Sequence, residues 1–72
     1  MRISYYPETD TMYIDLTSSI SDESREVSPG IVIDYDKDKN IVGIDIDNAS
    51  KKVDISELVL DRLPVKTQRT AL

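Results

Sequence analysis

The sequence predicts an α+β fold, in which a small antiparallel β-meander of four to five strands packs one C-terminal α-helix on one face. Three observations predict it: apolar residues alternate with polar ones over the first fifty residues, turn-forming residues separate these stretches, and a helical pattern follows. We expect a single domain over residues 1–64, with the sheet at 1–47 and the helix at about 54–63. Residues 65–72 form a polar tail that need not be ordered in the monomer.

The strands are predicted from four stretches in which every second residue is apolar. Alternate residues of a strand share one face, so each stretch has one apolar and one wetter face, as is typical of antiparallel sheets. The apolar sets are Ile3 and Tyr5; Met12, Ile14 and Leu16; Ile31, Ile33 and Tyr35; and Val42, Ile44 and Ile46. The segments PETD, SSISDES, SPG and KDKN are predicted to be the connections.

The segment DYDKDKN at residues 34–40 is interpreted as the turn of a hairpin. Pairing Asp36 with Ile41 would place Tyr35 opposite Val42 and all the apolar side chains of the hairpin on one face. The next apolar pairs would be Ile33 with Ile44 and Ile31 with Ile46. Residues 37–40 then form a short loop, to which Asp and Asn are suited because their side chains bond to nearby backbone.

The same segment also resembles the start of a calcium loop, so its nearest metal candidates are Asp34, Asp36 and Asp38. A helix–loop–helix calcium site needs glycine at loop position 6 and usually glutamate at position 12. Those positions are Lys39 and Asp45 here, and the flanking segments are predicted strands. We therefore favour a plain turn and predict no metal site.

The segment ESREVSPGIV predicts a second hairpin, with Pro29 and Gly30 at the two central positions of a type II turn. Simple pairing of Ser28 with Ile31 would turn Glu26 toward the apolar face. Two interpretations stay open at this point: a frayed edge strand, or a bulge made by Gly30.

A helix is predicted after residue 53 from its capping residues and its apolar spacing. Asp54 can cap the first turn, and Glu57 three residues later completes a capping box. Pro64 should end the helix near Leu63. The apolar stripe consists of Ile55, Leu58, Val59 and Leu63. We expect this helix to cover Ile14, Ile33 and Ile44 on the sheet.

Composition indicates a small protein that lacks the usual means of stabilising a small core. The 72 residues include no cysteine and no histidine, which excludes disulfides and thiolate or imidazole metal sites. Self-association is the remaining ordinary route to stability. The absence of cysteine suits a reducing cytoplasm, and no signal peptide or membrane-spanning run is apparent, so we expect a cytoplasmic protein without membrane contact.

Charge is distributed unevenly along the chain. Residues 1–50 hold four basic and eleven acidic residues, a balance of −7, whereas residues 51–72 hold five basic and three acidic residues, a balance of +2. An acidic body repels phosphate, so nucleic acid is not expected as a direct partner. A small basic protein would be attracted.

The face of the sheet opposite the predicted helix also carries apolar groups, which would need a second cover. We interpret it as a homodimer interface with tyrosines as anchors. The candidate residues are Tyr6, Tyr13, Val32 and Ile41. Alternation also places Asp15, Asp34 and Asp45 on this face, and we interpret them as a solvated acidic surface.

The sequence offers no recognisable catalytic arrangement. None of its serines has a histidine to activate it, and the two glycines form no phosphate-binding motif. Paired carboxylates on a sheet this small have no obvious cleft to separate their pKa values. We therefore expect no enzyme activity and no cofactor.

Two segments, YYPETDTMYIDL and EVSPGIVIDYDKDKNIVGIDIDNAS, together resemble a small prokaryotic family called domain of unknown function 2283. The resemblance covers residues 1–50, and the family usually has glycine where Lys39 stands. The matching positions are Pro7, Glu8, Asp10, Tyr13, Ile14, Leu16, Glu26, Val27, Pro29, Gly30, Asp34, Tyr35, Asp36, Val42, Gly43, Ile44, Ala49 and Ser50.

The resemblance implies no activity, because none is established for that family. Some of its members look like one half of two-gene modules whose neighbour resembles a toxin-like protein. The primary expectation is a non-catalytic protein-interaction module that forms a homodimer. The alternative is an antitoxin-like partner of a small basic protein, and the third is a carboxylate site for a divalent metal.

Overall fold

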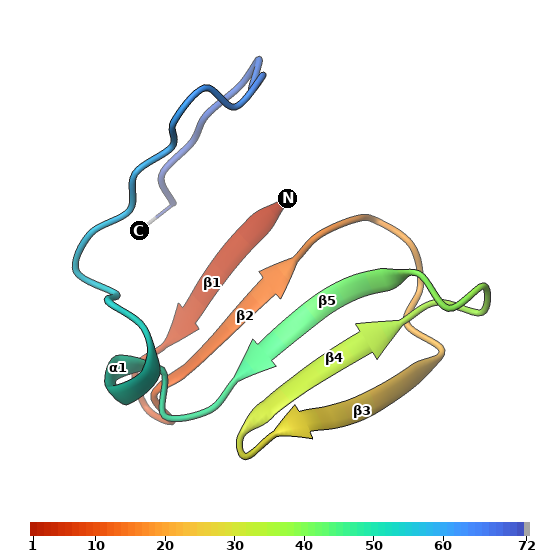
Figure 1. Cartoon of the computed structure of the whole chain (residues 1–72). Coiled ribbons are helices and arrows are strands. Elements are labelled where there is room, and N and C mark those ends of the chain that lie inside the picture. The colour runs from red at the N-terminus through yellow and green to blue at the C-terminus, as the bar shows by residue number, and fades with distance from the viewer. Residues whose placement is uncertain (72) are drawn as a thin grey trace.

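The computed structural model describes residues 1–71 and consists of one five-stranded antiparallel sheet followed by a very short helix (Figure 1). The fold is mostly β. The strands are β1 (Arg2–Tyr6), β2 (Thr11–Asp15), β3 (Glu23–Ser28), β4 (Ile31–Tyr35) and β5 (Ile41–Ile46), and the helix is α1 (Ala49–Lys52). The prediction of a small antiparallel sheet is confirmed.

The strand order, β1-β2-β5-β4-β3, differs from the predicted meander. Strand β2 pairs with β5, with Met12 opposite Ile46 and Ile14 opposite Ile44. The chain after β2 therefore crosses the end of the sheet to the far edge, where β3 begins (Figure 1). The meander was wrong because β3 is nearly all polar, which suits an edge strand, whereas apolar β5 is suited to the centre.

The β4–β5 hairpin confirms two of the three predicted apolar pairs, Ile31 with Ile46 and Ile33 with Ile44. Tyr35, however, lies opposite Ile41 and not Val42, because a bulge shifts the register there. The cause is the turn. Lys39 adopts a left-handed conformation, with φ 69°, and the amide of Asp36 donates to the carbonyl of Asn40 at 2.9 Å. The loop is thus one residue shorter than predicted, and the bulge restores the register.

The β3–β4 hairpin also contains a bulge, which decides between the two open interpretations. Glu26 lies opposite Val32 and Ser28 lies opposite Ile31, so the extra residue is Val27 and not Gly30. Gly30 has φ 75° in the turn, a conformation that glycine adopts without strain. The bulge keeps Glu26 on the wetter face.

The predicted helix at 54–63 is wrong: α1 ends at Lys52, Val53 is extended, and residues 54–63 contain no helix. The Asp54 carboxylate accepts hydrogen bonds from the amide and hydroxyl of Ser56, which forms a local turn, but there is no helix for Asp54 to cap. A helix of about ten residues is marginal in water unless it packs on something. Residues 65–71 also lack regular structure, and residue 72 of the predicted tail lies outside the described residues.

Without that helix, one face of the sheet keeps its apolar side chains largely uncovered. We call it the apolar face; by pairing register and alternation it comprises Ile3, Tyr5, Met12, Ile14, Ile31, Ile33, Tyr35, Ile41, Val42, Ile44 and Ile46. Within residues 1–71 the only buried apolar residues are Val42, Ile46 and Ala49. Ile14, Ile33 and Ile44, which the helix was expected to cover, are half-buried. In residues 1–71 no helix has the length and apolarity to cross a membrane.

The left-handed turn residue yields a test. Lys39→Gly is expected to be about 1 kcal/mol more stable than Lys39→Ala, because only glycine adopts positive φ without a steric cost from Cβ. Both variants remove the contact between the Lys39 ammonium and Glu23, so the difference isolates the backbone. Urea denaturation of the two variants measures it, and equal midpoints and slopes would contradict the prediction.

Candidate functional site

The four residues predicted to form an interface do not lie together. Tyr13 and Val32 flank Asp45 in one row across β2, β5 and β4. Tyr6 lies on the same face by alternation, on the edge strand β1, and is 51% exposed. Ile41 lies opposite Tyr35, so it belongs with the other face, because directly paired residues of an antiparallel sheet share a face. The bulge causes this correction.

The face that carries Tyr13 and Val32 is built around a hydrogen-bonded cluster. The Tyr13 hydroxyl donates to Asp34 Oδ2 at 2.5 Å, and the Ser24 hydroxyl donates to Asp34 Oδ1 at 2.5 Å. The Tyr13 side chain passes over Gly43 of β5, where a methyl group would collide with the phenol. The cluster therefore ties β2 to β4 and β3 across the intervening strand, and it requires glycine at position 43.

Negative charge surrounds this cluster, as alternation predicted for Asp15, Asp34 and Asp45. The hydrogen bond to Asp34, burial and the neighbouring carboxylates raise the pKa of Tyr13 to about 12. Burial, and then the charge of Asp47, raise the pKa of Asp45 above its usual value. We call the face that carries Tyr6, Tyr13, Asp15, Val32, Asp34 and Asp45 the acidic face. At neutral pH its phenol is a protonated donor, and the Asp34 carboxylate is already engaged by two hydroxyl groups.

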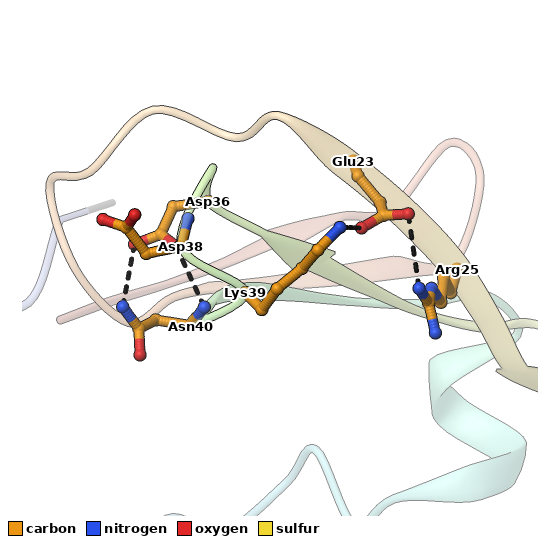
Figure 2. Close-up of polar contacts among 6 residues, drawn as sticks. All are labelled: Glu23, Arg25, Asp36, Asp38, Lys39 and Asn40. Carbon is orange, nitrogen blue, oxygen red and sulfur yellow. Dashed lines mark hydrogen bonds and ion pairs between the residues drawn. The ribbon is translucent and has the colours of Figure 1, made fainter.

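The three metal candidates are not brought together. Asp34 belongs to the cluster on the acidic face, whereas the Asp36 carboxylate accepts hydrogen bonds from the amides of Asp38 and Asn40 at 2.8 and 2.9 Å (Figure 2). These backbone donors, with Asn40 foremost, lower the pKa of Asp36. Throughout the described part of the chain, no three acidic side chains are grouped so that they could hold a metal ion. Asp36 organises the turn.

The same turn also bonds to strand β3. The Lys39 ammonium lies 2.7 Å from Glu23 Oε1, and the Arg25 guanidinium lies 3.4 Å from Glu23 Oε2 (Figure 2). The hydrogen bond from Lys39 is the main reason that the pKa of Glu23 is lowered. Lys39 thus links the β4–β5 turn to the edge strand, a role that glycine at this position could not have.

Sequence reasoning missed a second cluster, in which Asp10 holds the start of α1. The Asp10 carboxylate accepts hydrogen bonds from the Tyr5 hydroxyl at 2.8 Å and from the Ser50 amide and hydroxyl at 3.1 and 2.7 Å. Its carbonyl accepts the amide of Ala49 at 2.8 Å. Asn48 makes no side-chain cap, so Asp10 caps the helix from a distance. The family pattern did contain Asp10, Ala49 and Ser50, but nothing in it linked them.

An apolar surface without a covering layer lies where the segment after α1 leaves the sheet. We call residues 53–65 the arm. Its first part lines an open groove together with β1 and β2. The groove is lined by Ile3, Tyr5, Met12 and Ile14 from the sheet and by Val53, Asp54, Ile55, Glu57 and Leu58 from the arm. Leu58 and Val59 nevertheless stay 69% and 71% exposed. The candidate interaction surface is therefore the apolar face and the arm.

Comparison with known proteins identifies a family and no closer relative. The family model described as "Protein of unknown function (DUF2283)" matches residues 2–50, more than half of the chain. This confirms the resemblance seen in the sequence. No curated protein and no solved structure matches.

The pKa of Tyr13 gives a test of the cluster. The folded state favours the neutral phenol, so the Tyr13–Asp34 bond stabilises the fold fully below pH 10 and loses this effect as the pH rises toward 12. Ultraviolet titration should detect a phenol that ionises at about pH 12. Tyr13→Phe should remove this step, and Tyr6→Phe should leave it. If Asp34→Asn does not lower this pKa toward 10, the assigned cause is wrong.

Proposed function

We propose that this chain, which belongs to the DUF2283 family, is a non-catalytic protein-interaction module of the cytoplasm that associates with itself as a homodimer. The observation that carries the proposal is the amount of apolar surface that a single chain leaves exposed. The absence of histidine and cysteine and the engagement of Asp34 by two hydroxyl groups support a non-catalytic role. The absence of cysteine also suits a reducing compartment.

The surface area of the chain supports association. A compact monomer of 8.2 kDa is expected to expose about 4,500 Å², whereas this chain exposes 6074 Å². The excess, roughly 1,500 Å², is larger than the area of about 800 Å² that each partner buries in a standard interface. A second copy that covered this area would give each chain the core that it lacks alone.

The apolar face is better suited to this contact than the acidic face that the sequence had suggested. Burying Asp15 and Asp45 against a second copy would bring like charges together and remove them from water, at a cost of several kcal/mol for each unpaired ion. Burying Ile3 and Tyr5 removes apolar area from water without that cost. We therefore assign the homodimer contact to the apolar face.

The acidic face favours a second function, an antitoxin-like partner of a small basic protein. The supporting observation is that Asp15, Asp34 and Asp45 lie on one face around Tyr13, where the charge of each contributes to raising the pKa of Tyr13. Such a contact should weaken steeply with salt, because attraction between surface charges is screened. Titration calorimetry against a purified basic candidate at low and high salt, with Asp15→Asn as a variant, measures this. Affinity that ignores salt would exclude this function.

Two substitutions on the same strand test the dimer contact. Ile3 on the apolar face is 45% exposed and Tyr6 on the acidic face is 51% exposed, so both lie on β1 with similar exposure. Ile3→Lys is expected to weaken the dimer by roughly tenfold or more, since it places a charge in an apolar contact. Tyr6→Lys should leave the dimer unchanged.

Sedimentation equilibrium from about 1 to about 100 µM measures the association constant of each form. The unaltered chain is expected to reach twice its mass of 8.2 kDa. A monomer throughout that range would refute self-association. If Tyr6→Lys dissociates the dimer and Ile3→Lys does not, the contact lies on the acidic face instead.

A further inference from the structure

We infer that the arm, residues 53–65, crosses to the second copy and covers the apolar face of that copy's sheet. This inference rests on the self-association proposed above and names the segment that makes it. The arm is the binding element. Its site on the partner is the β4–β5 half of the apolar face, which carries Ile33 and Ile44.

The first support is the chemistry of the arm. It contains seven apolar residues, and it is exposed along its whole length. They are Val53, Ile55, Leu58, Val59, Leu60, Leu63 and Val65. An exposed segment this rich in apolar residues gains free energy wherever it can bury them, at about 25 cal/mol for each Å². The arm therefore needs an apolar surface, and the sheet of its own chain supplies only part of one.

The second support is the part of the sheet that the arm leaves uncovered. In its own chain the first part of the arm forms one wall of the groove beside β1 and β2, and the arm then continues on the β1 side, away from β4 and β3 (Figure 1). The half of the apolar face that carries Ile33 and Ile44 stays accessible. Ile3 and Ile14 line the same groove as Ile55 of the arm, so arm and face are chemically compatible.

The third support is charge. Residues 1–50 carry a balance of −7, so two sheets stacked directly on each other would repel. Residues 53–72 carry three basic and three acidic residues, a balance of zero, and within the arm Arg62 stands against Asp54, Glu57 and Asp61. An arm placed between the sheets would keep the two acidic bodies apart, and the segment from residue 53 onward would add no net charge. This favours exchange of arms over direct stacking of the two sheets.

The geometry of the chain permits the exchange. Thirteen extended residues span up to about 43 Å, which exceeds the 30 Å extent of the molecule. The arm leaves from a fixed point, because Asp10 holds Ser50 at the start of α1. A fixed origin reduces the conformational entropy that docking the arm would cost.

Disulfide trapping tests the exchange directly, because the chain has no cysteine of its own. Full-length Leu58→Cys is mixed with full-length Ile33→Cys at about 100 µM and oxidised, and the mixed disulfide is quantified by mass spectrometry. The matched control is Val32→Cys, the neighbouring residue of β4 on the acidic face. The Leu58–Ile33 product should exceed the Leu58–Val32 product roughly tenfold, because docking raises the effective thiol concentration. If Ile33→Cys does not fold, Ile44→Cys and Asp45→Cys form the equivalent pair on β5.

Three other outcomes would overturn the inference, and each gives a different disulfide product. Equal yields of the two mixed products would mean that the arm does not dock on the apolar face. A predominant disulfide between two Ile33→Cys chains would mean that the sheets stack directly. Closure within one chain of the Leu58→Cys/Ile33→Cys double variant would mean that the arm docks on its own sheet. In all three cases a dimer found by sedimentation would leave the proposed self-association intact, whereas a monomer would remove both.

Discussion

The pairing of β2 with β5 is the contact on which the rest of this structure depends. It joins the N-terminal hairpin to the β3–β4–β5 unit, and without it the chain would form two small sheets. It places Ile14 opposite Ile44 on one face and brings Tyr13 over Gly43 on the other. It also positions Leu16, whose amide donates to the carbonyl of Val42 at 2.9 Å. Both faces of the sheet thus take their character from one strand pair.

Several non-glycine residues of this protein adopt the left-handed backbone conformation. Asp10, Lys39 and Asn48 all have positive φ, which is costly for residues other than glycine. Asp10 and Lys39 offset the cost with side-chain bonds that glycine could not make: Asp10 to Ser50, and Lys39 to Glu23. Each bond connects segments far apart in the sequence. The turns of this protein therefore also act as links between its strands and its helix.

The two faces of the sheet differ in how far their side chains are satisfied within a single chain. On the acidic face, polar groups satisfy one another, and Tyr13, Asp34 and Ser24 form a closed set of hydrogen bonds. On the apolar face only Val42 and Ile46 are buried, which is a small core for a chain without disulfides. Stability and association are coupled in such a protein, since whatever covers the apolar face also supplies the missing core. The interaction role that we propose rests on the same deficit.

The sequence by itself determined the features that depend on near neighbours. Alternation defined which residues share a face over most of each strand, Asp and Asn marked the turn at 36–40, and Asp54 forms a local turn with Ser56. Only the tertiary structure decided the features that depend on distant contacts. The choice of β5 as the neighbour of β2 and the capping of Ser50 by Asp10 each join residues that no local pattern connects. The failure of the helix at 54–63 has the same origin, because its spacing specifies an apolar stripe, but a short helix is stable only where a surface receives that stripe.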